Sequence, residues 1–151
     1  MELTYHACFS RSYNSLGRDE ECMHLRRDVY FGFLKLFGEE YGYTLHAANS
    51  YATTLTKLKR FEESRSLMRK MIPVSRRVLG EVHRVTLTAR CCYGEAIYED
   101  PDATLDDLRE AVATLEDTIR SARRVFGNTN PLAQGMECYL DESRAALRAR
   151  E

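Results

Sequence analysis

The sequence has no long run of apolar residues, which excludes a protein with a membrane-spanning helix. No window approaches the roughly 18 consecutive apolar residues of a membrane-spanning helix. The first residues also lack the basic start and apolar stretch of a signal peptide. The net charge of −1 gives no overall preference for nucleic acid or for an anionic membrane. We therefore expect a cytosolic or nuclear protein, with the cytoplasm as its location, that binds neither nucleic acid nor membrane.

The cysteines and histidines likewise form no chemical pattern. There are five cysteines, an odd number, with no C-x-x-C spacing and no histidine at zinc-finger distance. A disulfide framework or a metal site is therefore not expected. Each cysteine lies among apolar positions of helical spacing, where a free thiol packs as a small hydrophobe. Because no nucleophile–base pair or phosphate-binding loop is visible, we expect no enzyme, no catalytic residue and no cofactor.

What the sequence does contain is a repeat. Similar stretches end at Gly38, Gly80 and Gly127, at intervals of 42 and then 47 residues. A period of this size indicates stacked supersecondary units. The extra residues of the third unit fall in 99–104, which we expect to be a loop.

Apolar positions three and four residues apart predict helices throughout the chain. Glycine is expected just past the ends of helices. Thr104 with Asp107 is expected to form a capping box. Asn130 is expected to cap the last helix, and His83, at the equivalent position before the helix at 84–98, is expected to be a cap as well. The expected helices are 3–16, 19–37, 45–58, 61–79, 84–98, 105–126 and a last one after Asn130, with a turn at 17–19.

Small residues recur at matched positions of these helices, where two helices must approach closely. They are Ser10, Ala52 and Gly94 in the first helices, and Cys22, Ser64 and Ala111 in the second helices. The pattern predicts one all-α domain, a right-handed α-solenoid of three antiparallel hairpins and a C-terminal single helix. The expected units are 1–43, 44–85, 86–132 and a terminal capping helix, 133–151.

These motifs resemble tetratricopeptide repeats, in particular the 42-residue variety of kinesin light chains. The first-helix pattern of large, small, two variable and Leu or Tyr stands at 51–55, and variants stand at 9–13 and 93–97. The inter-repeat signature Leu-Gly-x-x-His-Pro-x-Thr appears at 79–86, with Arg84 in place of proline. The family's usual tryptophan is absent.

The resemblance implies a binding groove on the concave side, lined by the first helices. By the family's register, the residues expected to contact a peptide are Arg11, Asn14, His46, Asn49, Thr53, Lys57, Thr88, Glu95 and Tyr98. Further groove positions are Thr4, Ala7, Thr56 and Cys91. The implied function is a non-catalytic adaptor or scaffold that binds a protein or peptide partner.

Two alternatives remain at this point. Residues 45–86 carry a charge of +6 and residues 87–133 carry −4, so oppositely charged units could promote weak self-association. The chain could therefore be a self-associating spacer, or a fragment of a longer array. Arg65, Arg69 and Arg76 form a basic stripe that we interpret as a solvated face and not as a nucleic-acid site.

Overall fold

The computed structural model describes residues 16–151, and all of its regular elements are helices. The prediction of an all-α helical repeat fold is confirmed. The helix expected over 3–16 and the small residue Ser10 lie outside the described residues. The described helices are α2 Leu16–Phe37, α3 Gly42–Lys57, α4 Phe61–Leu79, α5 Arg84–Tyr98, α6 Leu105–Phe126 and α7 Pro131–Arg150.

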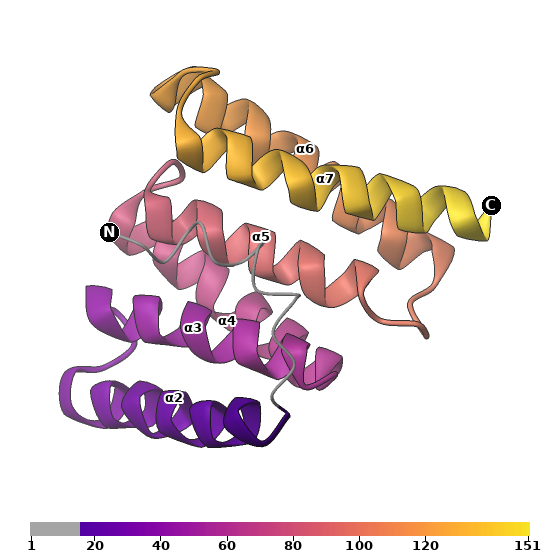
Figure 1. The fold of residues 1–151 in the computed structure, drawn as a ribbon. Helices are drawn as coiled ribbons and strands as arrows, with labels where there is room; N and C mark the ends of the chain where they lie inside the picture. Colours follow the sequence, from indigo (N-terminus) through magenta and orange to yellow (C-terminus); the bar gives the residue numbers. More distant parts are fainter. Residues whose placement is uncertain (1–15) are drawn as a thin grey trace.

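The helices stack as a two-layered array (Figure 1). Each helix packs against the next one along the chain, and α5 also packs against α3 and α7. The helices α3, α5 and α7 therefore form one continuous layer, and α4 and α6 lie behind it. The hairpin α3–α4 falls in the expected second unit and α5–α6 in the expected third. The exact division into units stays a prediction.

Small residues lie where paired helices approach closely, as predicted. The hydroxyl of Ser64 on α4 donates a 2.9 Å hydrogen bond to the carbonyl oxygen of Ala52 on α3. Thr56 in turn donates to Ser64. Gly94 on α5 lies against Leu115 of α6, so closely that a Cβ added at Gly94 would be 2.9 Å from Leu115 Cγ. The close approach is the physical reason for small side chains in the repeat.

The joints between units are built as the sequence indicates. Gly38, Gly80 and Gly127 all have positive φ, between 82° and 99°, a conformation that only glycine adopts readily. At the next helix starts, His83 Nδ1 accepts from the amide of Val85, and Asn130 Oδ1 accepts from the amide of Leu132. His83 is therefore a helix cap, equivalent to Asn130.

One expected turn is absent. Residues 17–19 were expected to separate two helices, but α2 begins at Leu16 and includes all three. Asp19 lies in the first turn of α2, where its charge is favourable, as the acidic residues predicted.

The loop before α6 ends in the expected capping box. Thr104 Oγ1 accepts from the amide of Asp107 at 3.1 Å, and Asp107 Oδ2 accepts from the amide of Thr104 at 2.8 Å. The Thr104 hydroxyl also donates to Asp107 Oδ2, at 2.8 Å, and the amide and hydroxyl of Thr104 together hold the pKa of Asp107 below its usual value.

The capping box predicts an acid-dependent loss of stability. A carboxyl group whose folded-state pKa is lowered stabilises the fold above its unfolded-state pKa, near 3.9, and loses that effect as the pH falls through the lower folded value. We expect Asp107→Asn to be less stable than wild type at pH 7, by about 1 kcal/mol. The difference should vanish near pH 2, as followed by urea unfolding at each pH. Asp141→Asn, on the exposed face of α7, is the control. A gap that persisted at pH 2 would contradict this origin.

Candidate binding surface

The layer of α3, α5 and α7 forms the candidate binding surface. These three helices contact one another in sequence, whereas α2, α4 and α6, as described, do not. Helices that touch on one side and separate on the other curve the array toward the touching side. The surface of α3, α5 and α7 is therefore the inner surface, where the sequence analysis expected the groove. We call it the inner surface below.

The structure leaves five of the expected groove residues at least partly accessible. His46 and Lys57 of α3 are exposed. Thr53 of α3 and Thr88 and Glu95 of α5 are half-buried. The Thr53 hydroxyl donates to the carbonyl oxygen of Asn49 in its own helix and lies 3.4 Å from Cys92 Sγ. Thr53 therefore lies at the seam between α3 and α5.

Two other expected residues are buried and join helices of neighbouring units. Asn49 Nδ2 donates a 2.9 Å hydrogen bond to the carbonyl oxygen of Val85 at the start of α5. The Tyr98 hydroxyl donates to Glu142 Oε2 of α7 at 2.8 Å. Their assignment as groove contacts stays a prediction, but the structure gives each of them a role in holding the array together.

The equivalent positions in the neighbouring repeats are buried as well. The position 42 residues after Asn49 is Cys91, and the position 42 residues before Tyr98 is Thr56. Cys91 and Thr56, which were also expected in the groove, are both buried, so these register positions face the interior. Arg11 and Asn14, with Thr4 and Ala7, lie outside the described residues.

The basic stripe on α4 is largely occupied by ion pairs within the chain. Arg65 Nη2 lies 2.9 Å from Asp100 Oδ2 and Nη1 lies 3.9 Å from Asp107 Oδ1. Arg76 pairs with Glu81 at 3.0 Å. Arg69 lies over the ring of Tyr93, 5.8 Å from its centroid. These contacts reduce the positive charge that α4 presents to solvent. The stripe was expected to be a solvated face, but only Arg69 and Arg76 are largely exposed, at 52% and 43%, whereas Arg65 is 11% exposed.

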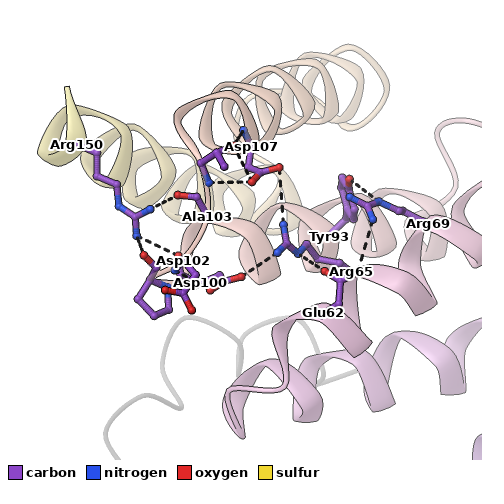
Figure 2. Close-up of polar contacts among 11 residues, drawn as sticks. Glu62, Arg65, Arg69, Tyr93, Asp100, Asp102, Ala103, Asp107 and Arg150 are labelled. Carbon is purple, nitrogen blue, oxygen red and sulfur yellow. Dashed lines mark hydrogen bonds and ion pairs between the residues drawn. The ribbon is translucent and has the colours of Figure 1, made fainter.

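Polar contacts of two arginines hold the 99–104 loop in place (Figure 2). The sequence predicted the loop but not these contacts. Arg65 approaches the loop from α4 through the side chain of Asp100. Arg150 approaches it from α7 and donates to the carbonyl oxygens of Asp100, Pro101 and Ala103. The loop is thereby held from both neighbouring units. The sequence feature that relates to the second contact is the position of Arg150 at the end of a polar helix.

A second arginine, Arg90 of α5, is buried against two carboxylates. Its Nη1 lies 3.3 Å from Glu81 Oε1, and its Nη2 binds Asp117 Oδ2. The hydrogen bond from Arg90 lowers the pKa of Asp117. Arg90 therefore links the joint before α5 to α6.

The thiol of Cys92 lies in the seam between α3 and α5, and Cys92 is buried. Burial raises its pKa to about 12. The reactive form of cysteine is the thiolate, so at pH 8 only about one molecule in 10⁴ would carry it. This agrees with cysteine as a packing residue.

Cys92 is therefore expected to resist alkylation until the protein unfolds. With iodoacetamide at pH 8, Cys22 and Cys138, which are half-buried, should be modified in the native protein, and Cys92 only after urea is added. Fragment-ion mass spectrometry separates Cys92 from Cys91. Modification of native Cys92 as fast as Cys138 would contradict its burial.

Two further features concern the residues from 16 onward. No group of three or more His, Cys, Asp or Glu side chains there is arranged to hold a metal ion. None of the six described helices combines the length and the apolar character needed to cross a membrane.

Comparison with known proteins identified one family. Residues 44–84, from the start of α3 to the start of α5, match the family model described as tetratricopeptide repeat. The kinesin light chain-like variety is consistent with this match. Comparison with curated proteins and with solved structures gave no match.

Proposed function

Because the chain is a helical repeat protein of the tetratricopeptide type, we propose that it is a non-catalytic adaptor or scaffold that holds a peptide or partner protein on its inner surface. Repeats of this type generally mediate protein–protein interaction. The observation that carries the proposal is the run of accessible polar side chains along α3 and α5. They are His46, Thr53, Lys57, Thr88 and Glu95.

Among these residues, Lys57 has the most specific expected role, which is to bind an acidic side chain of the partner. It is exposed in the last turn of α3 and forms no ion pair with the residues described from 16 onward. Lysine has three donors and a point charge that suits a carboxylate of a partner. His46, near the other end of α3, adds a second polar contact. An extended partner with an acidic side chain near Lys57 would fit this surface.

The test compares two charge reversals of the same kind. Lys57→Glu lies on the inner surface, whereas Lys35→Glu lies in the last turn of α2, so both changes meet a helix C-terminus. Affinity purification from a native extract, with each variant as bait, should lose specific partners for Lys57→Glu and keep them for Lys35→Glu. Circular dichroism should remain helical for both. Equal recovery of all partners by the two variants would refute the inner-surface assignment.

A self-associating spacer or a piece of a longer array is the second candidate, and one observation favours it. Leu25, Val29 and Leu36 lie along one side of α2 and are each at least half exposed. An apolar helix face of this kind is typical of a contact surface. Light scattering over a range of protein concentrations should then reveal assembly. A constant monomer mass would exclude self-association.

A further inference from the structure

A second surface lies between the second helices, away from the inner surface. An open groove of about 480 Å³ separates α2 from α4. Pockets that hold ligand groups commonly have volumes of this order. Its lining combines apolar and aromatic side chains with polar ones. The former are Tyr30, Phe31, Leu34, Tyr51 and Leu67, and the latter are Glu62, Glu63, Ser66 and Lys70.

Three aromatic rings meet in this groove. The Tyr30 ring stacks on Tyr51 with centroids 6.0 Å apart, and Phe31 lies 5.0 Å from Tyr30 and 6.4 Å from Tyr51. Phe31 is nevertheless 51% exposed. A rigid, accessible ring supported by other rings provides a large apolar contact at little entropic cost, as in the anchors of protein interfaces.

The same place in the next unit is covered by the chain itself. Tyr93 is the equivalent of Tyr51 by the 42-residue period. Arg69 lies over the Tyr93 ring, and its Nε donates to the Tyr93 hydroxyl at 3.2 Å (Figure 2). That hydroxyl donates to Glu110 at 2.8 Å. In the first unit the equivalent of Arg69 is Arg27, which lies 4.0 Å from Asp28 instead. Tyr51 is covered instead by Tyr30 and Phe31, and is as buried as Tyr93. The first unit therefore presents the half-exposed ring of Phe31 in its groove and no covering arginine.

The two ends of the groove carry opposite charges. Glu62 and Lys70 are eight residues apart on α4, or about 12 Å along the helix. Glu62 is 71% exposed and forms ion pairs with Arg65 at 3.4 Å and with Arg69 at 3.9 Å. Both arginines have closer partners in Asp100 and Tyr93. A basic residue of a partner would therefore replace two exposed, long ion pairs of Glu62 and leave neither arginine without a partner.

We propose that this groove docks an extended segment of a partner protein, with an apolar side chain against Phe31 between a basic residue at Glu62 and an acidic residue at Lys70. An extended chain advances about 3.3 Å per residue, so the two charged residues should be about four positions apart. This is a site separate from the inner surface. It would let the module hold two partner segments at once.

Selection of phage-displayed 12-residue peptides on the intact chain tests the proposal. We expect enriched peptides with an apolar residue between a base and an acid about four positions apart. Fluorescence anisotropy of a synthetic consensus peptide should show at least tenfold weaker binding to Phe31→Asp and to Glu62→Lys. Val125→Asp is the matched control, since Val125 of α6 is 48% exposed and lies outside the groove.

The Glu62→Lys charge reversal also allows a rescue experiment. Recovered binding would show that this variant is folded and that the charge of residue 62 selects the peptide. A peptide with its basic residue changed to Glu should recover binding to Glu62→Lys. Failure to select any peptide, or selected peptides without the base, would overturn the proposed occupant. Peptides that bind Phe31→Asp as well as wild type but are lost with Lys57→Glu would occupy the inner surface and overturn this site while supporting the other.

Discussion

Gly94→Val is expected to destabilise the protein by about 3 kcal/mol or more, because no side chain fits at this position. A Cβ at Gly94 would lie 2.9 to 3.1 Å from the Cγ and both Cδ atoms of Leu115, which is itself fully buried. Overpacking a filled core costs about 1 to 3 kcal/mol, and valine adds two further methyl groups to the clash. Urea unfolding monitored by circular dichroism measures the loss.

Two companion variants identify the cause. Gly32 in α2 is also a mid-helix glycine, but a Cβ there would meet no atom within 4 Å. Gly32→Ala should therefore stabilise the protein by up to about 1 kcal/mol through helix propensity. Leu115→Ala should cost less in the Gly94→Val background than in wild type, since it removes the clashing atoms. Additive effects of Gly94→Val and Leu115→Ala would refute the clash.

Arg65→Met is expected to lower the free energy of unfolding by about 3 kcal/mol, because it leaves a buried carboxylate without its counter-ion. The side chains of Arg65 and Asp100 are only 11% and 12% exposed and form a 2.9 Å ion pair. Without Arg65 the Asp100 charge keeps the hydrogen bond from the Asp102 amide but loses its counter-ion. Thermal unfolding should show a clear fall in the melting temperature.

An exposed ion pair on the same helix is the control. Arg60, the N-cap residue of α4, donates from Nε and Nη2 to the two carboxylate oxygens of Glu63, each at 2.7 Å, but these side chains are 40% and 53% exposed. Arg60→Met should cost at most about 1 kcal/mol. Adding Asp100→Asn to Arg65→Met should recover part of the lost stability. Equal effects of Arg60→Met and Arg65→Met would show that burial does not decide the cost.

The sequence was sufficient for the fold because its signals are local and repeated. Glycine at each joint, the small residues Ser64 and Gly94, and the capping residues His83, Thr104 and Asn130 each have one local meaning, and the structure places them as expected. Repetition strengthens the signal, since the pattern at Ala52 recurs at Gly94.

The candidate site was less predictable because a polar side chain on a helix has two uses. Asn49 was expected to meet a ligand but donates to Val85 in the next unit, and the Tyr98 hydroxyl donates to Glu142. The groove around Phe31 depends on which side chain covers a tyrosine, and this choice is set by contacts between units. Such contacts have no fixed spacing in the sequence.

The anchoring of the 99–104 loop bears on how the array unfolds. Arrays in which each unit touches only its neighbours can lose their end units one at a time. Here the side chain of Asp100 is held by α4 and its carbonyl by Arg150 of α7, two helices with no direct packing between them. Fraying of α7 therefore loosens the 99–104 loop, whose Asp100 is the ion-pair partner of Arg65 in α4. The unit of α4 and the terminal helix α7 are thermodynamically linked through one aspartate, and the last helices should melt together with the middle of the array in a single cooperative transition.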